Sequence, residues 1–371
     1  MAQRMIGAIA LFAVALGLSA CGDGAGADVR TNDGPPRVAL ETATAKEKLG
    51  EDDGFHAAIF YGAELSGSID DCGCPGHPEG GLPWRLGYTE GFRSAYPEAG
   101  YLQVDAGHSM SNVVNVEGQL YPDQIEKNSW VLKAFERFGF DAANISHNDI
   151  YYLAQFYNQA VYQKTLAETP MLGRFVSANL QPTRPDLVAP PAFVVREVSG
   201  QRVPNGSARV AFIGLTENLP ALERHTGFRA APPDAALEKV LPEARSGADM
   251  VVVLFYGAPD MARSLAQRFP GQVDAFVVAH PKAREEQPAL DGATKFVFAR
   301  YQTRQLGELR LRFAGTKLES ATNRYVTLDD QLPKDPIAEE MAATAKESIR
   351  KAQEERFNNP NAGPPAAAGG K

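Results

Sequence analysis

Two cysteines lie one glycine apart in the stretch SIDDCGCPGHPEGGL, which covers residues 68–82. Cys72, Cys74 and the nearby His77 offer nucleophilic sulfur and soft metal-binding atoms. A zinc ribbon would need a second cysteine pair and a c-type haem would need C-x-x-C-H, and the sequence has neither. The third cysteine of the chain is Cys21. Cys72 and Cys74 are therefore expected either to form a strained short-loop disulfide or to bind a metal ion as thiolates.

Three of the six histidines follow hydrophobic segments that we expect to be strands. His108 follows YLQVDAG, His147 follows FDAANIS and His280 follows DAFVVA. In open α/β sheets, ligands bind beyond the carboxyl ends of the strands. Because neutral imidazole is the commonest transition-metal ligand, three histidines at this edge predict a metal site. A single histidine at a strand end is more often a local hydrogen-bonding group, and we interpret His56 and His225 in that way.

Other polar residues are expected at the same edge of the sheet. Glu64 follows the first predicted strand, and Asn148 and Asp149 follow the third. Tyr256 ends the strand DMVVVLFY. Asp105 ends the second strand, and we interpret it as a residue that orients a neighbouring loop.

The elements that position these residues alternate between short apolar runs and amphipathic stretches. Strands are predicted over residues 56–63, 101–107, 140–146, 174–179, 209–215, 249–256, 274–280 and 295–299. Helices are predicted over residues 87–95, 123–138, 150–168, 234–246 and 259–268. Continuous Val/Ile/Phe strands separated by helices favour a largely parallel sheet covered on both faces. Residues 307–313, GELRLRF, alternate instead, which predicts a half-exposed antiparallel strand near the edge.

The N-terminal segment predicts export from the cytosol. Residues 1–21 contain Arg4, an apolar run and small residues before Cys21, which is the pattern of a secretory signal too short to span a membrane. The ending LSAC resembles the bacterial lipobox, in which the cysteine becomes lipid-modified. The alternative is an ordinary cleaved signal with a cysteine nearby. The lipobox interpretation predicts a protein anchored to a membrane through Cys21, in the bacterial cell envelope, on the periplasmic or extracytoplasmic side.

The remaining chain divides into four parts. Residues 22–54 are predicted to be a flexible tether, 55–330 one large α/β domain, 331–357 a weak surface helix and 358–371 a disordered tail. The formal net charge of −8, without a long basic run, argues against a nucleic-acid partner.

The order of these segments resembles the catalytic domain of the calcineurin-like metallophosphoesterases, in particular the 5′-nucleotidase branch. GGLPWRLGY at 80–88 resembles that branch's GGLARxAxx helix start, and RFGFDAANISHND resembles LGYDAxxxGNHE. GADMVVVLFYGAPD resembles GADVVVVLSHLG, and VDAFVVAHPK resembles VDVILGGHSH. The similarity covers residues 56–313. It implies an α/β sandwich of mixed, largely parallel sheets flanked by helices, over the domain at 55–330.

The resemblance also implies two metal ions that activate water for attack on phosphorus, but several of the family's ligand positions differ in this chain. The first D-x-H motif falls on Glu64 and Ser66, and the bridging aspartate falls on His108. The histidine of LSH falls on Tyr256. In GHSH the first histidine is kept as His280 and the second has become Lys282.

The GNHE motif can be placed in two ways. Counting without gaps from Asp141, its asparagine falls on His147 and its catalytic histidine on Asn148. A one-residue deletion would instead put His147 on the catalytic histidine. Asn148 and Asp149 are therefore the candidate catalytic residues. Asn179 falls on the asparagine of the family's SAN segment and is expected to be structural or near the ligands.

These departures predict one metal ion in place of two. One position has lost its hard ligands and gained the ammonium of Lys282, which opposes metal binding and could pair with Glu64. The other position collects His108, His147 and His280, a set suited to zinc, copper or iron.

The predicted ligands are thus these histidines with Cys72 and Cys74, which could instead form a bracing or a reversible disulfide. Glu64, Asp105, Asn179, Tyr256 and Lys282 are expected beside the ligands or at the substrate edge. Three function classes follow. The first is a remodelled metal-binding or redox protein in which efficient hydrolysis is not expected. The second is a metal-dependent, 5′-nucleotidase-like phosphoester hydrolase. The third is a non-catalytic scaffold or binding protein with an envelope protein partner.

Overall fold

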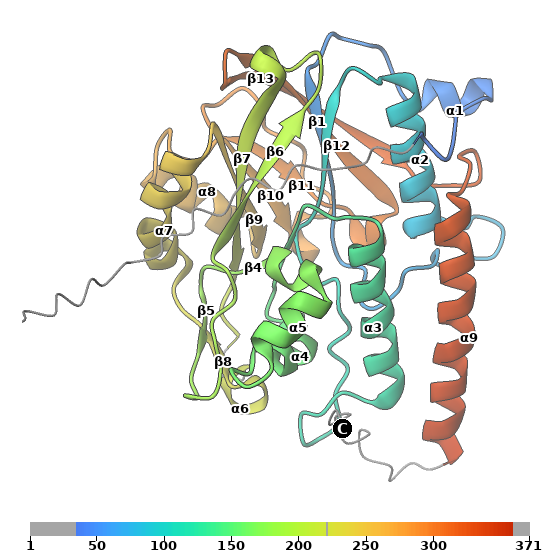
Figure 1. Cartoon of the computed structure of the whole chain (residues 1–371), viewed down its shortest axis with the longest axis vertical. Helices are drawn as coiled ribbons and strands as arrows, with labels where there is room; N and C mark the ends of the chain where they lie inside the picture. The colour runs from blue at the N-terminus through green and yellow to red at the C-terminus, as the bar shows by residue number, and fades with distance from the viewer. Residues whose placement is uncertain (1–34, 220–221, 359–371) are drawn as a thin grey trace, which may run out of the picture.

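The computed structural model describes residues 35–219 and 222–358. In these residues, two large sheets pack face to face, with helices on their outer faces (Figure 1). This arrangement confirms the predicted α/β sandwich of mixed sheets flanked by helices.

The first sheet has the strand order β13-β12-β1-β2-β3-β4. Its strands are β1 (Ala57–Gly62), β2 (Gly100–Asp105), β3 (Ala142–Asn144), β4 (Phe175–Val176), β12 (Gln305–Ala314) and β13 (Lys317–Thr327). Strands β1 to β4 are parallel, whereas β12 pairs antiparallel with both β1 and β13. The sequence predicts β12 and its antiparallel direction.

The second sheet has the strand order β11-β10-β9-β7-β6, and a short sheet pairs β5 with β8. The strands are β5 (Leu180–Pro182), β6 (Phe193–Ser199), β7 (Ser207–Thr216), β8 (Phe228–Ala230), β9 (Met250–Tyr256), β10 (Ala275–Ala279) and β11 (Lys295–Phe298). Only β6 runs antiparallel to its neighbour in the second sheet, so β7, β9, β10 and β11 point their carboxyl ends the same way.

Helices cover the outer faces of both sheets. The α-helices are α1 (Ala43–Glu47), α2 (Leu82–Ala95), α3 (Pro122–Arg137), α4 (Ile150–Leu153), α5 (Tyr162–Glu168), α6 (Leu222–Thr226), α7 (Pro233–Gly247), α8 (Pro259–Arg268) and α9 (Pro336–Asn358). Helices α7 and α8 pack on the second sheet, and α2 and α3 pack on the first (Figure 1). Short 3₁₀ turns occur at Ala154–Tyr157, Pro170–Arg174, Pro204–Gly206, Pro281–Ala283 and Tyr301–Thr303.

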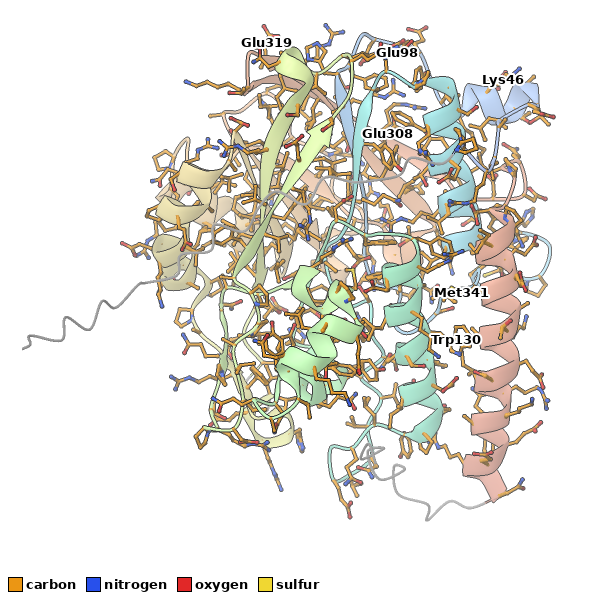
Figure 2. All side chains as sticks on the ribbon, viewed as in Figure 1. Lys46, Glu98, Trp130, Glu308, Glu319 and Met341 are labelled. Carbon is orange, nitrogen blue, oxygen red and sulfur yellow. The ribbon has the colours of Figure 1, made fainter. Side chains whose placement is uncertain are left out.

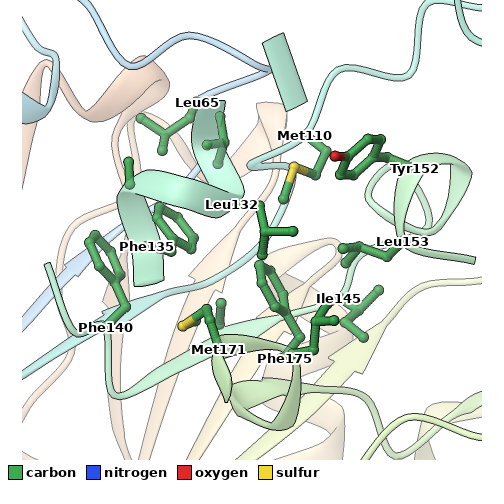
Figure 3. Packing of buried hydrophobic residues seen from close by; sticks show 14 of the residues in the cluster. Leu65, Met110, Leu132, Phe135, Phe140, Ile145, Tyr152, Leu153, Met171 and Phe175 are labelled. Carbon is green, nitrogen blue, oxygen red and sulfur yellow. The ribbon is translucent and has the colours of Figure 1, made fainter. Parts of the chain in front are cut away.

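The core between the sheets is apolar and tightly packed. Leu102, Val252, Val277 and Leu309, from four different strands, are fully buried there. A second cluster lies between the first sheet and α3, where Met110, Leu132, Phe135 and Phe175 pack together (Figure 3). Burial on this scale fixes the positions of the strand ends, because core side chains interdigitate at near-crystalline density.

Gly214 lies in β7 where β4 of the other sheet approaches closely. A Cβ at this position would lie 2.1 Å from the carbonyl oxygen of Val176. Only glycine therefore allows the two sheets to meet just before the strand end that carries Thr216.

Residues 35–54, the described part of the segment 22–54 predicted to be a flexible tether, pack on the domain. Leu40, Ala45 and Leu49 are buried in a cluster with Phe55. Arg310 donates hydrogen bonds to the carbonyl oxygens of Leu49 and Glu51. This segment covers the outer face of β12, so that Glu308 (labelled in Figure 2) and Arg310 are buried and the strand is not half-exposed.

Two predicted helices differ from those observed. The helix predicted over 150–168 is broken into α4, a 3₁₀ turn and α5, because Asn158 forms an isolated β-bridge with Leu187. The helix predicted over 331–357 is α9, which lies along α2 and α3 (Figure 1). Trp130 of α3 and Met341 of α9 lie between α3 and α9 (Figure 2). The Trp130 Nε1 donates a hydrogen bond to the hydroxyl oxygen of Ser348. The predicted signal peptide, Cys21 and residues 359–371 of the predicted tail lie outside the described residues.

Candidate functional site

The candidate site lies at the carboxyl ends of strands from both sheets. Glu64 and His108 follow β1 and β2 of the first sheet, and Tyr256 and His280 end or follow β9 and β10 of the second. The loops after β1 and β2 pair through backbone hydrogen bonds, Glu64 N to Gly107 O and Ser66 N to His108 O, both 3.0 Å. Glu64, Ser66 and His108 all have positive φ angles, of 58°, 51° and 57°. Non-glycine residues adopt this conformation at a cost, and such residues cluster at functional sites.

Tyr256 is the centre of the histidine cluster. Its ring centroid lies 5.6 Å from that of His108, 5.3 Å from His147 and 6.2 Å from His280, all in edge-on arrangements. The structure therefore brings together the three predicted histidines, but around a tyrosine ring. In the described residues, no group of three or more His, Cys, Asp or Glu side chains is arranged to hold a metal ion.

The ring nitrogens of His108 are both hydrogen-bonded. Nδ1 lies 3.2 Å from the Tyr256 hydroxyl and Nε2 lies 3.4 Å from the Ser66 hydroxyl. Burial lowers the pKa of His108, although the charges of Asp149 and Glu64 oppose this effect. His108 is thus a neutral ring held between two hydroxyl groups at neutral pH.

The ring nitrogens of His147 and His280 have different hydrogen-bond partners. His147 Nδ1 lies 3.3 Å from the Thr216 hydroxyl, which fixes the orientation of the ring. Burial lowers the pKa of His147. His280 Nδ1 accepts from the backbone N–H of Lys282 at 3.1 Å, and Nε2 lies 3.2 Å from Glu217 Oε1. A neutral His280 therefore carries its proton on Nε2 and donates it to Glu217.

An ion pair occupies the place where the resemblance puts the first metal's ligands. Arg284 Nε and Nη2 each donate to one carboxylate oxygen of Glu64 at 2.9 Å. Glu64 is 1% exposed. Lys282, the cation that the sequence suggested as the partner of Glu64, is exposed instead. The 3₁₀ turn at Pro281–Ala283 separates the two cations, so that Arg284 reaches Glu64 and Lys282 does not.

Asp149 is held by the backbone and has a structural role. Oδ2 accepts from Ser146 N and Oγ and from His108 N, at 2.8, 2.6 and 2.9 Å, and Oδ1 accepts from Met110 N at 2.7 Å. Although Asp149 is the N-terminal flanking residue of α4, its side chain does not cap that helix. The carboxylate instead stabilises the positive-φ turn at His108. Asn148 accepts from Asn112 Nδ2 at 2.6 Å and is also buried.

Asp105 and Arg85 form a buried pair beneath the site. Arg85 Nη1 lies 4.0 Å from Asp105 Oδ2, and both side chains are fully buried. Neither of these two atoms has a hydrogen-bond partner in the part of the chain that the structure describes. Burial raises the pKa of Asp105 to about 7, against the opposing charge of Arg85, and burial lowers the pKa of Arg85 to about 10. Asp105 also accepts from Gly107 N and Ser109 Oγ, which agrees with its predicted role in orienting the loop.

Asn179 joins the ends of two segments. Its Nδ2 donates to the carbonyl oxygens of Thr216 and Ala231 at 2.7 and 2.9 Å, and its Oδ1 accepts from Thr216 N at 3.0 Å. Asn179 therefore positions the end of β7, which carries Thr216 against His147. The prediction that Asn179 is structural or near the ligands stays a prediction.

The CGC loop contacts Arg304 and its own backbone. Cys72 and Cys74 are free thiols in the described residues. Cys74 Sγ lies 3.8 Å from Arg304 Nη2, and Cys74 N donates to Cys72 Sγ at 3.3 Å. A cysteine ligand to the histidine cluster stays a prediction.

Sequence reasoning missed Arg284 and Glu217 as members of the site. Glu217 directly follows β7, but no second feature of the sequence supports a role for it. Arg284 lies four residues after His280, and only its charge opposite the unusual Glu64 could have suggested it. Both residues depend on pairing with positions far away in the sequence.

Neither a protein-family model nor a curated protein matches this sequence, but solved structures match the fold. The Thermus thermophilus sulfate thiohydrolase SoxB, in complex with glycerol, is 16% identical with a TM-score of 0.59, over 80% of this chain and 61% of SoxB. A 5′-nucleotidase precursor from Thermus thermophilus is 17% identical with a TM-score of 0.57, over 80% of this chain and 59% of the precursor. The calcineurin-like phosphoesterase YfkN from Bacillus subtilis is 15% identical with a TM-score of 0.58, over 81% of this chain and 99% of YfkN.

These structures confirm that the chain has the metallophosphoesterase fold of the 5′-nucleotidase type. The chain spans about three-fifths of the length of SoxB and of the 5′-nucleotidase. At these identities the likeness shows the fold alone, because one fold can carry many chemistries.

Proposed function

We propose that this chain is a lipid-anchored envelope protein whose metallophosphoesterase-like domain keeps one transition-metal position and has replaced the other by an internal ion pair. The Glu64–Arg284 pair is the observation that carries this proposal. On this basis the domain does not hydrolyse phosphoesters at the rate of a two-metal enzyme, because the clamp formed by two ions on the attacking and leaving oxygens is absent.

The charge of Arg284 supports the loss of the first position. A guanidinium bound to both oxygens neutralises Glu64 and occupies one lone pair of each oxygen, so a metal ion would have to compete with Arg284 for this carboxylate. A divalent cation about 4 Å from that guanidinium would be repelled by roughly 8 kcal/mol at an effective dielectric constant of about 20. A metal ion at this position would therefore have to displace Arg284 from a buried carboxylate.

The residues proposed to hold a single ion are His147, Glu217 and His280. The Glu217 carboxylate contacts His280 Nε2, but in the described residues these side chains are not arranged as a metal-binding group, so they would have to move when an ion binds. As the residues lie, a metal on His280 Nε2 would move the proton to Nδ1 and break the hydrogen bond from Lys282 N. Binding is therefore expected to be coupled to a small rotation of His280. When bound, zinc, copper or iron would supply a Lewis acid or, for copper and iron, a redox centre.

The hydrolase alternative is supported by the fold and by the buried polar residues beneath the site. Asp105, Asp149 and Asn179 lie where the resemblance places active-site segments. However, each of them accepts or donates several hydrogen bonds within the protein. Both oxygens of Asp149 and both polar atoms of the Asn179 amide are engaged in this way, whereas Asp105 uses only Oδ1, and the engagement of Asp149 and Asn179 favours the remodelled site over a two-metal hydrolase.

Metal content and phosphatase activity together test the proposal. The full chain should be exported, purified without chelator and analysed for metal, and phosphate release from an aryl phosphate should be measured with added manganese. We expect one equivalent of metal, its loss in His280→Ala, and its retention in the control His225→Ala, which changes a histidine on α6. Two equivalents with phosphate release would restore the hydrolase, and no metal would favour the scaffold.

The lipid anchor rests on the N-terminal sequence, which lies outside the described residues. In residues 35–219 and 222–358, no helix combines the length and apolarity needed to cross a bilayer. The lipobox interpretation of the N-terminal sequence predicts that Cys21→Ser loses the lipid and moves from the membrane fraction to the soluble envelope fraction. A wild-type protein that is soluble and carries no lipid on Cys21 would contradict this part of the proposal.

A further inference from the structure

The CGC loop between β1 and α2 holds two thiols close together at the surface. Cys72 Sγ accepts from Cys74 N at 3.3 Å, and the Cys74 thiol lies 3.9 Å from the carbonyl oxygen of Cys72. Cys72 N is fixed by Glu79 O at 2.9 Å. This arrangement places the sulfur atoms of two half-exposed residues on the same turn of the loop.

The glycines of this loop give it room to close a bond between the sulfurs. Gly73 and Gly76 have φ angles of 64° and 83°, and a Cβ at either would meet no described atom within 4 Å. Gly73 is the residue between the two cysteines, so the backbone turn there is unhindered and open to solvent. A disulfide across a single residue is strained, and strained, exposed disulfides are the ones that exchange readily.

A cation lies beside the thiols. Arg304 Nη2 is 3.8 Å from Cys74 Sγ. The contacts of the two sulfur atoms differ. Cys74 N donates to Cys72 Sγ, which favours a thiolate on Cys72, whereas the Cys74 thiol faces an acceptor, the carbonyl oxygen of Cys72. We therefore take Cys72 as the nucleophile and Cys74 as the thiol that resolves the mixed disulfide.

We propose that Cys72 and Cys74 form a thiol–disulfide exchange site, which reacts with disulfides carried by another protein or by a small molecule. The Cys72 thiolate attacks one sulfur of the partner disulfide, whose S–S bond breaks and whose other sulfur leaves with the electron pair as a thiolate. Cys74 then loses its proton and attacks Cys72, releasing the second partner thiolate. Two protein thiols are oxidised, one disulfide is reduced to two thiols, and both protons pass to the departing sulfurs.

A metal site or a permanent brace fits the contacts of the two cysteines less well. A soft-metal site would need further ligands, and no third His, Cys, Asp or Glu in the described part of the chain joins the pair as a metal-binding group. His77 is exposed, and its carbonyl oxygen is the group 4.0 Å from Cys72 Sγ. A permanent structural disulfide is also unnecessary. Backbone hydrogen bonds from Cys72 N to Glu79 O and from Gly80 N to Leu328 O already hold the loop.

Mass spectrometry of the full-length protein tests this proposal. Trypsin cleaves after Lys48 and Arg85, so both cysteines fall in one peptide that is separate from Cys21. The protein should be equilibrated with oxidised and reduced glutathione, or with oxidised thioredoxin, then quenched in acid, alkylated and digested. We expect the peptide to shift from two alkyl groups to none, reversibly with dithiothreitol, and Cys74→Ser to trap a mixed disulfide on Cys72. Reaction with one oxidant and not the other would identify the partner as a protein or a small molecule.

Arg304 provides a graded control. Arg304→Ala is expected to slow alkylation of Cys72 by about threefold or more at pH 7, and Arg304→Lys to restore the rate, because the effect is one of charge. The proposal is overturned if the peptide keeps two reactive thiols in excess of both oxidants, or if a bound metal protects them. It is equally overturned if the disulfide, once formed, can be reduced only after unfolding. These results do not depend on the metal content of the histidine site.

Discussion

Arg284 and Glu64 lie 220 positions apart in the sequence and are joined by two hydrogen bonds of 2.9 Å. The pair links the loop after β10 in one sheet to the loop after β1 in the other. It places a protein cation where the resemblance implies a metal ligand. The candidate site is therefore divided into an ion pair on one side and a cluster of histidines around Tyr256 on the other.

Removing the cation of this pair is expected to destabilise the fold. Arg284→Met would leave Glu64 buried and unpaired, which should lower the free energy of unfolding by about 2 kcal/mol, less than for a fully buried pair because Arg284 is partly exposed. Glu64→Gln in the same chain should recover most of this loss. Urea denaturation measures both. Arg350→Met is the matched control, since its partner Glu347 is exposed on α9, and it should cost less than about 0.5 kcal/mol.

Replacing Asp149 is predicted to lower the free energy of unfolding, because its carboxylate holds the backbone of the site loops. Asp149→Asn replaces one acceptor oxygen by a donor facing backbone N–H groups, so we expect a loss of about 3 kcal/mol in the free energy of unfolding. Thermal or urea unfolding checks this. Asp186→Asn, at an exposed carboxylate, should change stability little. If Asp149→Asn unfolds like the wild type, the structural role assigned to Asp149 is wrong.

Much of this fold follows from local pattern, whereas the site depends on distant pairs. Continuous apolar runs predict β1, β7, β9 and β10 to within two residues of their ends, because buried parallel strands need them. The outer strands β6 and β13 carry mixed polar residues, and the pattern does not predict them. The motif alignment favours Lys282 as the cation that pairs with Glu64. The partner is Arg284, because of the 3₁₀ turn at Pro281–Ala283, and the sequence alone does not show this turn or the position of Glu64 beside it. The backbone donors that hold Asp149 are likewise invisible before folding.

The buried carboxyl of Asp105 should make stability depend on pH. Its pKa is about 7 in the fold, above its ordinary value of 3.8, because burial disfavours the charged form. The folded state then binds more protons than the unfolded state between these values, so the stabilisation present at low pH is lost as pH rises towards 7. Relative to Asp105→Asn, the wild type should lose about 2 kcal/mol between pH 5 and pH 8.

Paired urea titrations of wild type and Asp105→Asn at both pH values measure this difference, and the subtraction cancels other titrating groups. An identical pH dependence in the two proteins would mean that Arg85, 4.0 Å away, keeps Asp105 ionised throughout.

The close approach of the two sheets at Gly214 predicts a severe packing defect. In Gly214→Ala the new Cβ would overlap the Val176 carbonyl oxygen, so we expect a loss of about 3 kcal/mol or a failure to fold. Gly247→Ala, whose Cβ would lie 3.9 Å from Val195 Cγ2, should be nearly neutral. Melting temperatures of the two variants compare them directly. Equal stability would show that the sheets can separate at β4 and β7 without cost.

Metal stoichiometry tests the central claim most directly. Elemental analysis of the full chain, exported and purified without chelator, is predicted to give one equivalent of zinc, copper or iron per chain in the wild type. Arg284 and Glu64 should exclude a second ion even when metal is added in excess. Two tightly bound equivalents per chain would contradict the replacement of one metal position by the ion pair.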